Sequence, residues 1–229
     1  MKLAIMQPYF MPYIGYWQLM AAVDRYVIFD DVNFINRGWI NRNNILVNGK
    51  SHLFSVSLRG ASQNKLINEI EIADDFVKLR KTLEMAYKKA PYFIETMNIL
   101  DEIFCYEDKN LSRFIGHSFE VIANHIQIVC EYVYSSEIEK NNGLKASDKI
   151  LDICKRQGAD IYINAIGGVE LYDKYEFTKN GIDLKFLKPD ITPYKQYYNE
   201  FIGSLSIIDV MMFNSPEDIN VMMDHFELL

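Results

Sequence analysis

The sequence lacks the features of several common protein classes. It has no run of eighteen apolar residues, so it predicts no membrane span. Residues 1–6 meet a proline at position 8 without a long apolar core or a small-residue cleavage site, unlike a signal peptide. Cysteine is scarce: Cys105, Cys130 and Cys154 are odd in number and stand in apolar contexts. We therefore expect buried free thiols and a cytoplasmic protein.

Basic residues and the familiar catalytic motifs are also in short supply. Lys and Arg number 24 against 31 Asp and Glu, and the net charge of −7 argues against general binding of nucleic acid. No GxGxxG and no GxxxxGK[ST] occurs, so neither a dinucleotide site nor a Walker site is supported. No GxSxG motif occurs either. The four histidines and the cysteines lack the spacing of zinc ligands, so we predict no metal site.

The chain instead alternates between strand and helix patterns. Strands are expected at 2–6, 25–29, 67–72, 129–134, 160–165 and 184–187, and helices at 15–23, 76–89, 93–106, 111–126, 147–157, from 169, at 207–212 and at 219–225. An Asn48-Gly49 turn between two apolar runs predicts a β-hairpin over 44–58. With no repeat and no linker, we predict one α/β domain over residues 1–229. It has a mostly parallel sheet flanked by helices, a β-hairpin and a helical middle segment.

A Pro-rich aromatic segment, residues 7–17, directly follows the first expected strand. Ligands of open α/β sheets bind at the carboxyl ends of the strands, and two prolines would make this loop rigid. We predict that Gln7, Tyr9 and Tyr13 bind a substrate. The alternative is a rigid loop whose aromatic rings only close the core.

An acidic pair, Asp30 and Asp31, follows the second expected strand and should open onto the same edge. Neighbouring residues of an extended chain point to opposite faces, so we expect one of the two to face the pocket. We predict a catalytic role for this pair. The alternative is a solvated acidic turn.

Planar donors and glycines complete the predicted substrate site. The polar stretch that follows the acidic pair offers groups suited to carboxylate, phosphate or carbonyl recognition, namely Arg37, Trp39, Asn41, Arg42 and Asn43. Gly167 and Gly168 follow a later strand and are predicted to cradle a phosphate, the alternative being a simple turn. Residues 194–198 form a late polar-aromatic cluster that either stacks on a base or sugar or forms a surface strand edge.

These segments together resemble the WbqC-like protein family. The matching motifs are Gln7-Pro8-x-x-x-Pro12-Tyr13-x-Gly15-Tyr16, Phe29-Asp30-Asp31-Val32, Trp39-x-Asn41-Arg42-Asn43, Tyr87-x-Lys89-Ala90-Pro91-Tyr92-Phe93, Gly158-Ala159-Asp160-x-Tyr162, Gly167-Gly168 and Leu205-Ser206-Ile207-Ile208-Asp209. The resemblance extends over essentially the whole chain. Family members often belong to cell-surface polysaccharide pathways, so the resemblance implies such a role. The family commonly has a His before Gln-Pro, where this chain has Met6.

We therefore hypothesise a transferase of cell-surface polysaccharide (O-antigen type) biosynthesis. It would move an acyl or aminoacyl group to a nucleotide-linked amino sugar, with Asp30 or Asp31 accepting the proton of the attacking amine. We expect no tightly bound cofactor; an activated acyl donor or a nucleotide would be the second small molecule. Two alternatives stay open. One is a nucleotide-activating enzyme like the nucleotidyltransferases, although those usually place histidines in the first loop. The other is a non-catalytic module that binds a sugar nucleotide.

Overall fold

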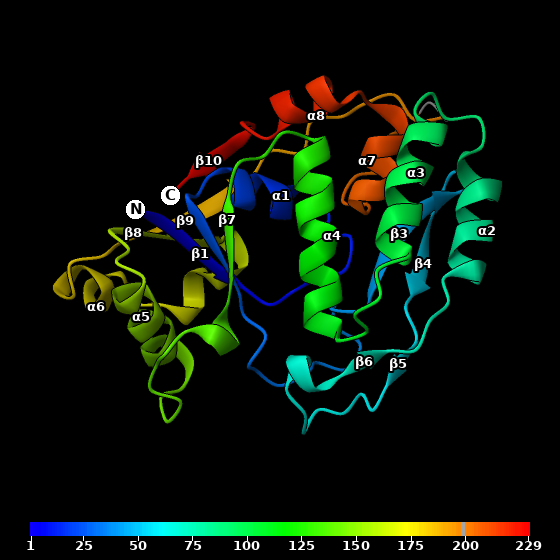
Figure 1. Cartoon of the computed structure of the whole chain (residues 1–229). Coiled ribbons are helices and arrows are strands. Elements are labelled where there is room, and N and C mark those ends of the chain that lie inside the picture. The colour runs from blue at the N-terminus through cyan, green and yellow to red at the C-terminus, as the bar shows by residue number, and fades with distance from the viewer. Residues whose placement is uncertain (198–199) are drawn as a thin grey trace.

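A six-stranded sheet in the order β10-β9-β8-β1-β2-β7 organises the chain (Figure 1). The structure is a computed structural model that describes residues 1–197 and 200–229. The strands are β1 Lys2–Met6, β2 Arg25–Ile28, β7 Glu131–Tyr134, β8 Ile161–Ala165, β9 Asp183–Pro189 and β10 Phe226–Leu228. Neighbouring strands pair in parallel from β9 to β7, and only β10 is antiparallel, to β9.

The order of the parallel strands creates a switch point beside β1. The chain passes from β1 outward to β2 and β7, and then returns to β8 and β9 on the other side of β1. Counted along the chain, the order across the sheet is 3-2-1-4-5, the order of the doubly wound nucleotide-binding folds. In such sheets the crevice between the carboxyl ends of the two central strands, here β1 and β8, is where ligands bind.

Helices cover both faces of the sheet (Figure 1). Helices α1 (Ile14–Ala21) and α4 (Leu111–His125) pack on one face, where Trp17 and Phe119 belong to the larger hydrophobic cluster. Helices α5 (Ala146–Arg156) and α6 (Lys174–Lys179) pack on the other face, where Ile153 and Phe177 belong to a second cluster. Loops at the carboxyl edge therefore emerge between two filled layers.

Most of the remaining elements extend the α1/α4 side, whereas the two 3₁₀ segments that directly follow β7 and β8 lie at the carboxyl edge. The remaining elements are β3 Arg42–Val47, β4 Lys50–Ser55, β5 Leu58–Arg59, η1 Ile67–Glu69, β6 Glu71–Ile72, α2 Val77–Tyr87, α3 Phe93–Phe104, η2 Ser135–Glu137, η3 Ile166–Leu171, α7 Ile207–Phe213 and α8 Pro216–Met222. Strands β3 and β4 form the predicted hairpin, and its turn residues Asn48 and Gly49 have φ of 50° and 72°, as a type I′ turn requires. The predicted fold class, a mostly parallel α/β sheet with a hairpin and a helical middle segment, is confirmed.

Several predicted elements are wrong in detail. The strand expected at 67–72 is interrupted by η1, because the fully buried Ile67 and Ile70 stand three residues apart and a 3₁₀ turn places such residues on one side. The helix expected from 169 is a 3₁₀ segment, and α6 begins only at Lys174, where the Asp173 side chain caps it. Strand β10 was not predicted, since it is a three-residue edge strand with an exposed side.

The cysteines are free but not uniformly buried. Cys154 is buried, Cys130 is half-buried and Cys105 is exposed, so the expectation of buried thiols is wrong for Cys105. Burial raises the pKa of both Cys154 and Cys130 to about 12, which keeps these thiols protonated and unreactive. Nowhere in residues 1–197 and 200–229 does a helix combine the length and the apolar character that crossing a membrane requires.

Candidate functional site

Three adjoining pockets lie along the carboxyl edge of the parallel sheet. The first, which we call the switch-point pocket, has a volume of about 400 Å³ and is lined by residues that follow β1 and β8. They include Gln7, Tyr9, Asn164, Gly167 and Gly168. Four of these five were predicted as substrate-binding residues, and they come from loops about 160 residues apart.

The second pocket, which we call the lysine pocket, has a volume of about 500 Å³. Asp31, Lys145 and Lys149 supply its charged lining. It adjoins the switch-point pocket, because both are lined by Phe29, Ile150, Leu171 and Tyr172.

The third pocket, which we call the aromatic pocket, has a volume of about 370 Å³. Tyr9, Tyr13, Trp39 and Asn43 line it together with two prolines, Ile191 and Ser204. Both N-terminal segments of the sequence therefore face one pocket. Tyr9 also lines the switch-point pocket, so the three pockets follow one another along the edge in the order aromatic, switch-point, lysine.

In the switch-point pocket, small residues bring the backbone close to the cavity. A Cβ atom on Gly168 would lie 2.7 Å from Nδ2 of Asn164, so a larger residue there would push the Asn164 amide aside. A Cβ atom on Gly167 would meet nothing within 4 Å. Within residues 1–197 and 200–229, the side-chain amide of Gln7 makes no hydrogen bond, which leaves its donors and acceptor to a ligand.

In the lysine pocket, one carboxylate holds two ammonium groups. The Asp31 Oδ2 atom lies 2.9 Å from Nζ of Lys140 and 3.0 Å from Nζ of Lys149, and Ser135 donates a hydrogen bond to Oδ1. The Lys140 side chain is only 2 % exposed, whereas Lys149 lines the pocket and lies 5.1 Å from the Phe29 ring. Burial raises the pKa of Asp31, but the hydrogen bonds from Ser135 and the two lysines outweigh burial and bring that pKa below its ordinary value.

Asp30 faces away from these pockets. Its Oδ1 atom accepts from the backbone N–H of Ser136 at 2.9 Å, and its Oδ2 atom accepts from the Ser136 hydroxyl at 2.8 Å and from Ser112 at 3.4 Å. The side chain is 1 % exposed and ties β2 to α4 and η2. As the alternation of an extended chain predicts, only Asp31 of the acidic pair lines a pocket.

In the aromatic pocket, the polar groups are largely used by the protein itself. The Asn43 amide donates to the backbone oxygen of Met11 at 2.7 Å and accepts from the backbone N–H of Asn44 at 2.8 Å. Burial raises the pKa of both Tyr9 and Tyr13, so their hydroxyl groups stay neutral near pH 7. The pocket therefore offers aromatic faces and a few neutral donors.

Three predicted binding residues line none of these three pockets. Asn41 donates to the backbone oxygen of Val56 at 2.8 Å and so links the residue before β3 to the residue after β4. Arg37 lies on the exposed loop that precedes Trp39 and has a φ of 60°. Arg42 donates from Nε to the backbone oxygen of Gly38 at 2.9 Å and also to that of Arg37, so it anchors the loop that carries Trp39.

Sequence reasoning also missed residues that the fold brings to the site. Lys149 and Lys145 belong to an ordinary amphipathic helix and its start, and nothing local marks them as pocket residues. Asn164 carries a usable signal, since it is a polar residue at the end of a buried strand and directly precedes Ala165-Ile166-Gly167.

Two members of the late polar-aromatic cluster have a structural role. Tyr194 Oη and Gln196 Nε2 donate to Oδ2 of the fully buried Asp209 at 2.6 and 2.7 Å, and Tyr87 Oη donates to Oδ1 at 2.7 Å. Tyr198, the last member of the predicted cluster, lies outside the described residues.

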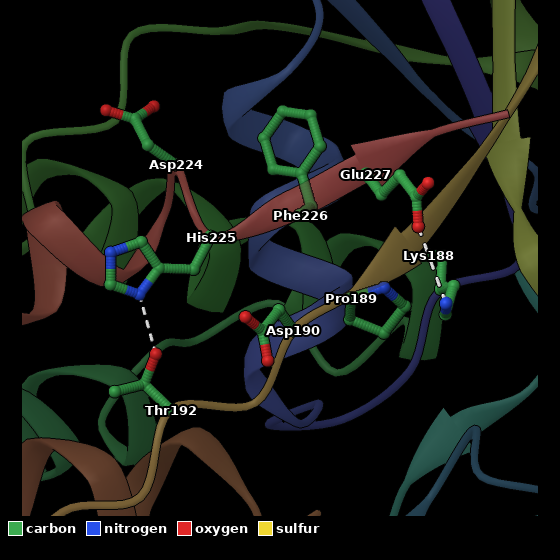
Figure 2. Close-up of a pocket in the computed structure, with 8 residues that line it drawn as sticks. All are labelled: Lys188, Pro189, Asp190, Thr192, Asp224, His225, Phe226 and Glu227. Carbon is green, nitrogen blue, oxygen red and sulfur yellow. Dashed lines mark hydrogen bonds and ion pairs between the residues drawn. The ribbon is translucent and has the colours of Figure 1, made fainter.

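A further pocket, of about 540 Å³, lies where β9 ends and β10 begins (Figure 2). The Thr192 hydroxyl lies 2.6 Å from Nδ1 of His225, and Lys188 pairs with Glu227 at 3.4 Å. No predicted site residue lines this pocket. In the part of the chain that the structure describes, no group of three or more His, Cys, Asp or Glu side chains could hold a metal ion.

Comparison with known proteins shows the family of the chain. The model of the WbqC-like protein family matches residues 7–221, which include both N-terminal segments and the Gly167-Gly168 pair. The chain belongs to the WbqC-like protein family. Among similar proteins is one of Mycobacterium tuberculosis described as uncharacterized protein Rv1507c, which is 27 % identical over 218 residues that cover 93 % of each chain. No solved structure matches the chain.

Proposed function

We propose that this WbqC-like protein binds a nucleotide-linked amino sugar along the three pockets and transfers an acyl or aminoacyl group to the amine of that sugar. The observation that carries the proposal is the switch-point pocket, which Gln7, Gly167 and Gly168 line at the carboxyl ends of β1 and β8. Doubly wound sheets bind nucleotides in this crevice. The family supports a place in the biosynthesis of cell-surface polysaccharide of the O-antigen type.

The shape of the edge supports a long, segmented ligand. Pockets of about 370, 400 and 500 Å³ share lining residues and offer aromatic, backbone-rich and cationic surfaces in turn. A nucleotide sugar has a planar base, a charged diphosphate and a polar sugar. The aromatic surface suits the base, and the backbone-rich and cationic surfaces that follow suit the diphosphate and the polar sugar beyond it.

In the proposed reaction the amine nitrogen attacks the acyl carbon, the leaving group takes the electron pair of its broken bond, and the nitrogen passes its proton to that leaving group. The Lys149 ammonium lines the pocket and would stabilise negative charge on the carbonyl oxygen during attack. Asp31 has a pKa below its ordinary value, which makes it a weak base. We therefore propose that Asp31 holds Lys149 in place, and that Asp30 acts in the fold rather than in the reaction.

A panel of nucleotide sugars tests the proposal. Nucleotide-linked amino sugars should raise the melting temperature more than the same nucleotides linked to sugars without an amine. Incubation with an acyl-CoA or an activated amino acid should add the acyl or aminoacyl mass to the sugar nucleotide, detected by mass spectrometry. The Lys149→Met variant should lose transfer, whereas Lys155→Met, on the exposed side of the same helix, should keep it. The absence of any product across amino-sugar nucleotides and donors would reject the proposal.

A second candidate is a nucleotidyltransferase-like enzyme, which the 3-2-1-4-5 strand order and the Pro-rich loop after β1 favour. Such an enzyme would join a nucleoside triphosphate to a sugar phosphate and release pyrophosphate. Pyrophosphate release in the presence of a nucleoside triphosphate and a sugar phosphate would favour this candidate over acyl transfer. A non-catalytic binding module would show the thermal shift with neither product.

A further inference from the structure

Two aromatic side chains of the aromatic pocket are held from behind by other residues. The Tyr9 ring stacks on the Tyr16 ring, with centroids 5.5 Å apart and an interplanar angle of 28°. Tyr13 lies against Gly15, because a Cβ atom on Gly15 would lie 2.5 Å from the Tyr13 ring; the same atom would lie 2.9 Å from Cβ of Pro189, which also lines the pocket. Both rings therefore meet the pocket in positions that the fold sets before a ligand arrives.

The third aromatic side chain, Trp39, is held by Arg42. The guanidinium carbon of Arg42 lies 5.6 Å from the Trp39 ring centroid, and the same guanidinium group binds the backbone oxygens of Arg37 and Gly38. Arg42 thus fixes both the ring and the loop that carries it. Trp39 is nevertheless 43 % exposed, and an exposed indole on the wall of a pocket has a face free for a ligand.

From these contacts we infer that the aromatic pocket binds the base of the nucleotide, and that the sugar end of the ligand points to the lysine pocket. This inference rests on the proposed function and adds the direction of the ligand. A sugar ring would need many hydrogen-bond partners, but the Asn43 amide is already engaged and most of the remaining lining is aromatic or apolar. A planar base needs flat faces, which Tyr9, Tyr13 and Trp39 supply.

The charges along the edge support the same direction. The aromatic pocket has no charged lining residue, whereas the lysine pocket has Lys145 and Lys149 beside a single carboxylate, Asp31. Phosphates attached to a base in the aromatic pocket would pass Tyr9 into the switch-point pocket, beside Gly167 and Gly168. The sugar beyond them would then reach Lys149, where the transfer is proposed to occur.

Tryptophan fluorescence tests this direction with nucleoside monophosphates, which have a base but no second sugar. The chain has two tryptophans, and Trp17 is fully buried, so acrylamide quenching reports on Trp39. We expect at least one of UMP, CMP, TMP, GMP and AMP to protect Trp39 from acrylamide. Trp39→Ala, followed by calorimetry, should weaken that binding at least tenfold, and Trp39→Phe should retain most of it.

Arg42 is a positioning residue in this inference, and its role can be measured in the free protein. Arg42→Ala should increase acrylamide quenching of Trp39 in the free protein and weaken nucleotide binding several-fold, while the melting temperature changes little. Arg42→Lys should restore only part, since an ammonium group cannot bind two carbonyls and lie along a ring in the same way. Arg59→Ala, a change at an exposed arginine that lines none of the three pockets, should alter neither property.

The Lys149→Met variant distinguishes binding of the base from binding of the sugar. This variant should leave monophosphate binding within twofold of the wild type and weaken binding of the matching nucleotide sugar at least fivefold. If monophosphate binding depends on Lys149 and is indifferent to Trp39, the inferred direction is wrong. The inferred direction is also wrong if none of the five monophosphates protects Trp39 from acrylamide.

These outcomes remain distinct from those of the proposed function. Protection of Trp39 by a nucleotide, without acyl transfer to any amino sugar, would support the base site and reject the transferase. Transfer that proceeds equally well in Trp39→Ala would support the transferase and reject the base site.

Discussion

Gly15 lies so close to Tyr13 that a Cβ atom on it would stand 2.5 Å from the tyrosine ring. On the other side the same atom would meet Cβ of Pro189 at 2.9 Å. The second residue of α1 is therefore a glycine because the helix begins directly beneath the aromatic pocket. The contact between Gly15 and Tyr13 thus joins the start of α1 to the wall of the aromatic pocket.

Gly15→Ala should consequently affect the pocket more than the fold. Alanine gains up to about 1 kcal/mol in helix propensity over glycine, and overpacking costs about 1–3 kcal/mol. Since Tyr13 is half-buried, an added methyl group can displace its ring at moderate cost, and we expect a net loss of unfolding free energy of about 1 kcal/mol, measured by urea denaturation. The displaced ring should weaken nucleotide binding several-fold. Gly167→Ala has no neighbour within 4 Å and should leave the unfolding free energy unchanged; equal effects of the two changes would contradict this account.

Gly116 in α4 provides a stability prediction away from the site. A Cβ atom there would lie 2.1 Å from Oη of Tyr134 and 3.1 Å from Cδ1 of Ile28. Gly116→Ala should therefore lower the unfolding free energy by about 1–3 kcal/mol despite the better helix propensity of alanine. Adding Tyr134→Phe removes the closest atom and should recover part of the loss, so a double-mutant cycle should show coupling. Purely additive effects of the two changes would mean that the Tyr134 hydroxyl does not cause the loss of stability in Gly116→Ala.

Asp31 should govern part of the stability in acid. Its folded pKa is lowered, because the hydrogen bonds from Ser135, Lys140 and Lys149 outweigh burial. The stabilisation is thus present above the unfolded pKa of about 3.9 and is lost as the pH falls through the lower folded value. Asp31→Asn should destabilise the protein at pH 7 by about 3 kcal/mol, since it leaves the buried Lys140 without its carboxylate. The loss should shrink as the pH falls from about 4 through the lower folded pKa, where Asp31 of the wild type also becomes protonated. Chemical denaturation at several pH values measures both, and a pH-independent difference would exclude the ion pair as the cause.

Asp209 should behave in the opposite sense. Its burial raises the pKa more than the hydrogen bonds from Tyr194, Tyr87 and Gln196 lower it. The stabilisation from this group is full below the unfolded pKa of about 3.9 and declines as the pH rises through the higher folded value. Asp209→Asn places an amide where three donors converge and should cost about 1–3 kcal/mol. The deficit should be largest in acid and smaller at pH 7, the reverse of Asp31→Asn, and the same trend in both variants would contradict the assignment.

The sequence predicted a site residue correctly where that residue directly follows a recognisable strand. Gln7, Tyr9 and Tyr13 follow a strand whose apolar run is clear in the sequence, and the strand-end rule places them at the correct edge. The rule failed for Arg42 and Asn41, because their polar groups bind nearby backbone oxygens, a use that residue type alone does not reveal.

The sequence by itself determined the strands and the helix between residues 2 and 55, the Asn48-Gly49 turn and the family. These depend on patterns within about ten residues, where propensity and apolar periodicity act. Only the tertiary structure decided that Asp31 rather than Asp30 lines a pocket and that Lys149, 118 residues later, meets it at 3.0 Å. That meeting follows from the placement of β8 beside β1 and of α5 on the opposite face from α4. Strand order is set by packing between distant segments, and no local pattern encodes which strands become neighbours.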